Sequence, residues 1–175
     1  VLSIDADERV PPELRAEIQT ALDNSVFDVY EMPRSSYYCG RFMRHSGWWP
    51  DYVRRLFRRG TARFSPAPVH ESLQTDKNVG RLRTPLEHWS FRTMEDVLDK
   101  VNRYSSLSAP TVLQHGHRPT IMTAILHGVS TFIRTYFLRR GFLDGSHGFM
   151  LAVSNAEGSY YRYIKAMLLE QQPRD

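Results

Sequence analysis

The chain opens on Val1-Leu2-Ser3-Ile4-Asp5-Ala6-Asp7-Glu8, a short apolar run that ends in acidic residues. The run predicts a buried strand over residues 1–4, entered without a Met, as expected of a strand cut from a larger sheet. Alternation along a strand would place Asp5 and Asp7 on the same side. In α/β sheets ligands bind at the carboxyl ends of strands, where two carboxylates offer hard oxygen ligands to Mg²⁺ or Mn²⁺. The alternative is an acidic strand-to-helix loop, in which Glu8 favours a helix N-terminus.

The composition is that of a globular domain. The 175 residues are 41% hydrophobic and 24% charged, which excludes a disordered tail, a collagen-like chain and a disulfide scaffold. The single Cys39 cannot form an internal disulfide, and it favours a reducing compartment.

Arginine dominates the positive charge of the chain. Of its 23 basic residues, 20 are Arg, and the net charge is +4. Between residues 39 and 64, seven Arg accompany Trp48 and Trp49, with Asp51 as the one acid. This mixture fits a pocket for phosphates and sugar rings, a solvated face or a nucleic-acid surface. Because no nucleic-acid-binding motif accompanies it, nucleic acid is the least favoured partner.

Local signals predict one helix and several short strands in the first half of the chain. A helix that starts at Pro11-Pro12 would present Leu14, Ile18 and Leu22 on one face. We expect extended segments at residues 26–32, 37–43, 52–58 and 82–91, with Pro33 ending the first. We expect a loop at residues 48–51 and a polar, mobile segment at residues 71–80.

The second half of the chain predicts helices. Thr93 and Asp96 form a capping box for a helix that reaches about residue 106. We then expect a linker at residues 108–119, a long helix at residues 120–140 capped by Gly141, and one or two helices within residues 145–171. This order predicts the second half of an α/β domain with a helical appendage.

The helix expected at residues 120–140 carries a wide apolar stripe. Residues 119–133 have no formal charge, but these 15 residues are too few to span a bilayer. Arg134, Arg139 and Arg140 follow at the end of the stripe. An apolar stripe with terminal arginines can lie in a membrane interface, and the alternative is a core helix.

Three further residues can carry chemistry. His70 and Glu71 follow a proline-rich extended segment, and such a pair can supply a metal ligand and a general base. The alternative for this pair is a plain surface loop. His88 lies beside Trp89 in a short strand, where metal ligation and a structural role both remain open.

Taken together, the ordered blocks resemble those of family 2 glycosyltransferases, in particular the branch of lipopolysaccharide core β-glucosyltransferases. The resemblance covers nearly the whole chain. Its blocks are residues 2–8, Arg55-Leu56-Phe57-Arg58-Arg59-Gly60, Val69-His70-Glu71, His88, residues 100–104 and Arg140-Gly141-Phe142-Leu143-Asp144-Gly145.

The resemblance implies an α/β fold of the GT-A type, the fold of nucleotide-diphospho-sugar transferases. Residues 1–107 would be a portion of the catalytic domain that starts at the D-x-D strand, and residues 108–175 a helical region able to associate with membrane. The first strands and most of the nucleotide pocket would lie upstream, and a truncated, inactive relic is one alternative for this chain.

The resemblance also assigns roles to residues. Asp7 would contact the metal that bridges the donor diphosphate, and Asp5 would contact that metal through water or the donor ribose. Glu71 would be the general base, and His70 or His88 would complete the metal shell. The remaining assignments place Arg55 and Arg58 on the diphosphate or an acceptor phosphate, and Trp48 or Trp49 on an acceptor sugar.

The reaction so implied is an inverting transfer that depends on Mg²⁺ or Mn²⁺, from a nucleotide-diphosphate sugar such as a UDP-sugar to a saccharide or lipid-linked acceptor. Such an enzyme would be cytoplasmic or peripheral on the inner face of the plasma membrane. Two alternatives remain at this point. One is a metal-dependent phosphoesterase built from Asp5, Asp7, His70 and His88, and the other is a non-catalytic basic binding module.

Overall fold

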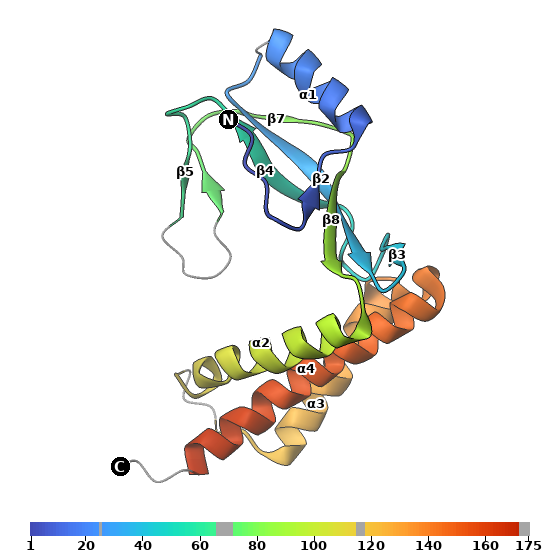
Figure 1. Ribbon diagram of the computed structural model, residues 1–175. Helices are drawn as coiled ribbons and strands as arrows, with labels where there is room; N and C mark the ends of the chain where they lie inside the picture. Colours follow the sequence, from blue (N-terminus) through green and yellow to red (C-terminus); the bar gives the residue numbers. More distant parts are fainter. Residues whose placement is uncertain (25, 66–71, 115–117, 172–175) are drawn as a thin grey trace. The chain divides into compact units, whose positions relative to one another are not determined.

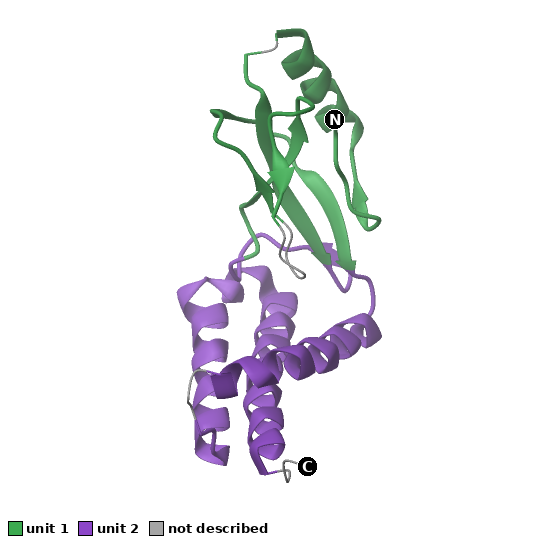
Figure 2. Ribbon diagram, turned by 90° about the vertical axis from the view of Figure 1, so that its left-hand side faces the viewer, with its two compact units in different colours: residues 1–37, 48–90 green, residues 38–47, 91–175 purple. Residues whose placement is uncertain are grey.

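The computed structural model describes residues 1–24, 26–65, 72–114 and 118–171 (Figure 1). The chain forms two compact units, Val1–Tyr37 with Trp48–Ser90 and Tyr38–Gly47 with Phe91–Asp175 (Figure 2). Neither unit is continuous in sequence, because Tyr38–Gly47 belongs to the second. The boundary expected between residues 107 and 108 falls inside a helix of that second unit, α2 (Met94–Gln114).

The first unit is built on a mixed sheet around β2 (Val29–Tyr38). Strand β4 (Asp51–Phe57) pairs with β2 antiparallel, and β7 (Val79–Arg81) pairs with it parallel. On the path β1-β8-β2, β1 (Glu8–Arg9) pairs antiparallel with β8 (Leu86–Phe91). Strands β5 (Arg63–Phe64) and β6 (Leu73–Gln74) form a separate antiparallel pair. The predicted mixed α/β class is therefore confirmed.

Helix α1 (Pro12–Asn24) begins at the second of the two predicted prolines and covers this sheet (Figure 1). Its Leu14 and Ile18 are buried in the core cluster, whose other members are Tyr30, Met32, Leu56, Leu82 and Leu86. Removing a leucine side chain from water contributes roughly 1.5–3 kcal/mol, so these two positions hold the helix on the sheet. Leu22 was expected on the same face, but it is 49% exposed.

The opening residues are extended, but the prediction that they are buried is wrong. Val1 and Ile4 are 56% and 47% exposed. The run lies along β4, where Leu2 bridges Leu56 and the Ser3 N–H donates to the Arg55 carbonyl at 2.8 Å. Backbone pairing along an edge does not by itself bury side chains, so Val1 and Ile4 stay exposed beside β4.

Two segments in the middle of the chain differ from their predictions. Pro33 does not end its strand, because β2 continues through it to Tyr38, with Pro33 opposite Tyr52; a strand accepts proline wherever no neighbouring carbonyl needs its N–H. The segment at residues 71–80 contains β6 and the start of β7. Gly80 of β7 is buried, and a Cβ there would lie 2.6 Å from the Tyr30 ring, so glycine allows this strand to approach β2.

The second unit is mainly helical, with α2, α3 (Ile121–Ile133) and α4 (Gly145–Gln171). A π-helical turn, η1 (Arg134–Leu138), extends α3, and a 3₁₀ turn, η2 (Gly141–Asp144), precedes α4. The predicted capping box is confirmed: the Thr93 N–H donates to Asp96 Oδ2 at 3.1 Å, and the Asp96 N–H donates to Thr93 Oγ1 at 3.3 Å. The linker expected from residue 108 is wrong, because Ala109 and Val112 of α2 are buried in a cluster with Ala166 of α4.

The end of the long helix also differs from its prediction. Arg140, and not Gly141, adopts the left-handed backbone conformation, with φ 55°. Gly141 is buried instead, and a Cβ there would lie 2.8 Å from both Ser46 Oγ and the Thr135 carbonyl oxygen. Glycine is therefore required at residue 141 by close packing.

Asp144 anchors residues 38–47 within the second unit, where a short strand, β3 (Arg41–Phe42), lies. The Asp144 carboxylate is 1% exposed and accepts from the His45 N–H at 2.8 Å and the Arg44 N–H at 3.3 Å. His45 Nδ1 lies 3.2 Å from its other oxygen, and Arg41 Nη2 lies 3.6 Å from that oxygen. A buried carboxylate satisfied in this way fixes the loop at several points.

Candidate active site

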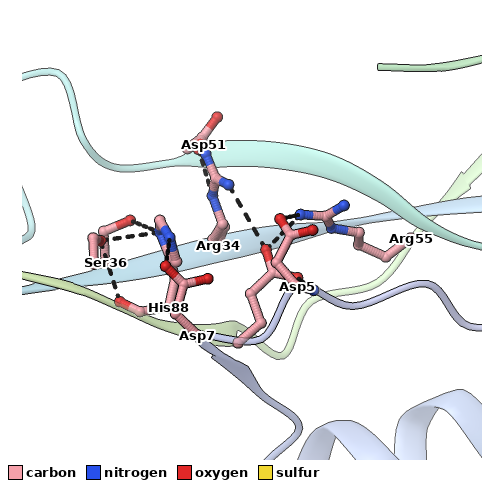
Figure 3. Close-up of polar contacts among 9 residues, drawn as sticks. Asp5, Asp7, Arg34, Ser36, Asp51, Arg55 and His88 are labelled. Atoms are coloured by element: carbon pink, nitrogen blue, oxygen red, sulfur yellow. Dashed lines mark hydrogen bonds and ion pairs between the residues drawn. The ribbon is translucent and has the colours of Figure 1, made fainter. Parts of the chain in front are cut away.

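The acidic residues at the start of the chain form a turn, and this replaces the predicted alternation of Asp5 and Asp7 along a strand. Within this acidic turn (residues 5–8) the Glu8 N–H donates to the Asp5 carbonyl at 3.0 Å, and the Asp5 N–H donates to Glu8 Oε2 at 3.0 Å. The Trp89 N–H of β8 donates to the Asp7 carbonyl at 2.8 Å. Asp5 and Asp7 therefore leave the turn separately and face different partners (Figure 3).

Glu8 is the buried anchor of the acidic turn. Its side chain is fully buried, and its Oε1 lies 2.7 Å from Arg55 Nη2 and 3.7 Å from Arg34 Nη1. Arg55 also donates to Asp5, and Arg34 donates to Asp51 through Nε at 2.9 Å. Burial alone would lower the pKa of Arg55, but its hydrogen bonds and charge interactions with Glu8 and Asp5 raise it. These ion pairs lock the turn to β2 and β4.

Asp7 and His88, predicted as metal ligands, are brought together. Asp7 Oδ2 lies 3.2 Å from His88 Nε2, and the Asp7 side chain is 41% exposed. On its other side, His88 Nδ1 lies 3.0 Å from Ser36 Oγ and 3.1 Å from Ser90 Oγ. A carboxylate that solvent can reach therefore faces an imidazole whose orientation two hydroxyls fix (Figure 3).

The surroundings of His88 favour the neutral form of its imidazole. Burial, followed by the positive charge of Arg34, lowers its pKa below the usual 6.5, against the opposing effects of Asp7 and Glu8. A hydroxyl can either donate to Nδ1 or accept from it, so Ser36 and Ser90 permit both tautomers. When Nδ1 carries the proton, Nε2 presents a lone pair beside the Asp7 carboxylate, which is the arrangement that a cation needs.

We expect the burial of His88 to make the unfolding free energy depend on pH. Because the folded-state pKa lies below 6.5, the unfolded chain takes up a proton first as the pH falls. Stability is therefore unaffected above pH 6.5 and declines from there toward the folded pKa. To test this, the urea-unfolding free energies of the protein and of His88→Gln are measured between about pH 7 and about pH 5 in the presence of a metal chelator. Parallel curves for the two proteins would contradict the assignment.

The other predicted site residues are not all assembled here. Arg58 lies elsewhere on the first unit, 64% exposed, with Nε 3.3 Å from Asp28 Oδ1. Trp48 and Trp49 are half-buried in the predicted loop before β4. His70 and Glu71 lie outside the described residues. Among the residues that the structure describes, no group of three or more His, Cys, Asp or Glu side chains is placed to hold a metal ion.

Arg34, Ser36 and the burial of Glu8 were not predicted from the sequence. Arg34 and Ser36 lie in β2, where they are polar residues in a strand flanked by tyrosines. That pattern is a usable signal, because polar side chains inside such a strand need partners. The burial of Glu8 left no comparable signal, since it depends on Arg34 and Arg55 lying on adjacent strands.

Comparisons with known proteins give a consistent result. The chain is 32% identical to the lipopolysaccharide core biosynthesis glycosyltransferase LpsC of Rhizobium meliloti, over 97% of this chain and 63% of that protein. It is 26% identical to an uncharacterized glycosyltransferase of Rickettsia prowazekii, over 94% of this chain and 61% of that protein. A third, from Rickettsia bellii, is 25% identical over 98% of this chain and 63% of its own length. No protein-family model matches the chain, and no solved structure matches it.

The chain thus spans just over three fifths of the length of these relatives. The resemblance indicated by its ordered blocks is confirmed by their names. Over nearly its whole length, the chain is similar to part of bacterial proteins named as glycosyltransferases, one of them an enzyme of lipopolysaccharide core biosynthesis.

Proposed function

We propose that this protein acts in an inverting, metal-dependent transfer of a sugar from a nucleotide diphosphate to a saccharide acceptor. The observation that carries the proposal is the pairing of Asp7 and His88, with Asp7 Oδ2 3.2 Å from His88 Nε2. The similarity to proteins named as glycosyltransferases supports the reaction class. We further propose that the fold is of the GT-A type and that the donor is a UDP-sugar.

The side chains present fit a hard divalent cation. Asp7 would supply a carboxylate oxygen and His88 a ring nitrogen, and the hydroxyl of Ser36 or Ser90 would then accept the proton of the other ring nitrogen. Mg²⁺ is commonly held by one or two protein ligands together with substrate phosphates, and Mn²⁺ also accepts imidazole. A bound cation would neutralise the charge that develops on the leaving diphosphate.

Asp5 and Arg55 extend the site beyond the pair. Asp5 accepts a hydrogen bond from Arg55, but its side chain is 56% exposed. Its carboxylate would therefore be accessible to the donor ribose or to a metal-bound water. Arg55 is only 11% exposed and paired with Glu8. The main role of Arg55 would therefore be to position the acidic turn, and contact with the diphosphate would be its second role.

For the general base we retain Glu71, on the resemblance alone. A single displacement at the anomeric carbon inverts its configuration and needs one base to remove the proton of the acceptor hydroxyl. Trp48 or Trp49 would stack on the acceptor sugar. The acceptor would be a lipid-linked saccharide of the lipopolysaccharide core type, so the enzyme would work in contact with the cytoplasmic face of a membrane.

Donor turnover tests this proposal. The chain, with the upstream part implied by the resemblance restored, is supplied with a panel of nucleotide sugars and a lipid-linked acceptor mixture, with Mn²⁺, with Mg²⁺ or with EDTA, and release of nucleoside diphosphate is measured. We expect one donor to be turned over, with loss of turnover in EDTA. Hydrolysis of simple phosphoesters without donor turnover would instead establish a phosphoesterase, and binding of polyanions without any turnover would establish a basic binding module.

A further inference from the structure

Helix α3 buries small residues and exposes large apolar ones, which is the opposite of the usual pattern for a helix of a soluble protein. The side that it buries carries small residues, Ala124 and Gly128, with Thr135 following in η1. Gly128 approaches α4 closely, since a Cβ there would lie 3.4 Å from the Ala156 carbonyl oxygen. The large apolar side chains point away from α4 and are 42–62% exposed; this apolar face comprises Ile121, Met122, Ile125, Leu126, Val129 and Ile133.

The apolar face is continuous. At about 100° per residue its members occupy an arc of roughly 140°. It continues into η1, where Phe137 is 54% exposed. Ring contacts then join Phe132 and Tyr136 to Phe149 of α4, at centroid distances of 5.7 and 5.6 Å. Aromatic side chains of this kind are enriched where hydrocarbon meets water.

Charge identifies what covers this face. From residue 119 to residue 143 the sequence contains three arginines, Arg134, Arg139 and Arg140, and no acidic residue. All three are exposed and lie at one end of the apolar face. A second copy of the chain would bring the same positive charge, whereas an anionic lipid surface supplies both hydrocarbon and the opposite charge.

The helical stretch is longer than the uncharged segment of the sequence. Because η1 continues α3, Ile121–Leu138 forms 18 residues with mean hydropathy 1.2, of which 17% are buried, so by length and composition it could cross a membrane. Its other side, however, packs on α4, where His127 stacks on Tyr163 at 3.9 Å. Helix α4 carries Lys165, which is bonded to Asn102 and Ser105 of α2. A span would have to break this packing or carry a charged helix with it.

We propose that the apolar face of the second unit inserts into one leaflet of an anionic membrane, with α3 parallel to the membrane plane. The leucine and isoleucine side chains would reach the acyl boundary, and the arginines would bind lipid phosphates. This inference rests on the proposed function, in which the enzyme works at a membrane. It adds which surface meets the membrane and how α3 is oriented there. It is tested without any sugar donor, so its failure and the failure of sugar transfer are distinguishable.

The test is vesicle flotation of the protein and its variants. Phosphatidylglycerol/phosphatidylethanolamine vesicles are compared with phosphatidylcholine vesicles. Leu126→Gln lies on the apolar face, and its matched control is Leu107→Gln on α2; the two leucines are 60% and 59% exposed. Circular dichroism and urea unfolding verify that each variant is folded.

We expect binding to anionic vesicles, weakened about tenfold by Leu126→Gln and unchanged by Leu107→Gln. Arg134→Gln should weaken binding to anionic vesicles by about fivefold and leave binding to neutral vesicles unchanged. Equal binding by both leucine variants overturns the proposal. So does a dimer in light scattering that Leu126→Gln dissociates while vesicle binding stays the same, because the face would then join two copies.

Discussion

Replacing Asp7 by asparagine is expected to lower the rate of sugar transfer by at least about 100-fold, which corresponds to about 2.7 kcal/mol of transition-state stabilisation. The amide is uncharged and a poor ligand for a hard cation, so the developing charge on the diphosphate loses its counter-charge. Because the Asp7 side chain is 41% exposed, the unfolding free energy should change by less than about 1 kcal/mol. Donor turnover and urea unfolding measure the two effects.

Asp28→Asn is the matched control for this substitution. Asp28 is 39% exposed, and its carboxylate also faces a basic side chain, Arg58 Nε at 3.3 Å. The two variants therefore lose the same carboxylate charge at a similar exposure, but only Asp7 lies beside His88. Near-normal turnover by the Asp7 variant, or an equal loss in both variants, would remove Asp7 from the metal site.

Glu8→Gln is expected to destabilise the first unit by about 3 kcal/mol, the low end of the cost of breaking a buried pair by removing one partner. The amide keeps the size of the side chain but leaves Arg55, 11% exposed, without its buried counter-charge. Asp5 still faces Arg55, and this limits the loss. The measurement is the urea-unfolding free energy at pH 7.

Two comparisons sharpen this prediction. Glu31→Gln is the control, because Glu31 pairs with Arg81 at 2.6 Å, but that arginine is 61% exposed, and a pair of this kind contributes at most about 1 kcal/mol. A double substitution, Glu8→Leu with Arg55→Leu, should recover much of the stability lost by Glu8→Leu alone. If Glu8→Gln costs no more than Glu31→Gln, the buried pair does not hold the acidic turn.

Local signals in the sequence predicted those elements whose causes are local. The Pro12 start of α1 and the Thr93 capping box depend on neighbours within one helical turn, and both are confirmed. Asp7 and His88 were among the residues predicted for one site, and they are in contact, but the turn that carries Asp7 was not predicted. The acidic turn replaces a strand because Arg55, 47 residues beyond Glu8 in the chain, supplies the buried counter-charge.

Long-range contacts also explain which features of the second unit were not predicted from the sequence. The apolar stripe of residues 120–140 was visible in the sequence, but the side of the helix that faces the protein was not. Contacts with α4 decide that side, and they select the small residues Ala124 and Gly128. The continuation of α2 beyond residue 107 likewise depends on Ala166, far along the chain.

The anchoring of residues 38–47 by Asp144 has a consequence for synthesis of the chain on the ribosome. The bonds from Arg44 and His45 to Asp144 join residues 100 and 99 positions apart. At about 5–20 residues per second, this segment emerges roughly 5–20 s before its anchor exists. During that interval Met43, fully buried in the finished protein, has no completed unit to enter. The nascent chain therefore presents this segment to chaperones and proteases until Asp144 has been translated.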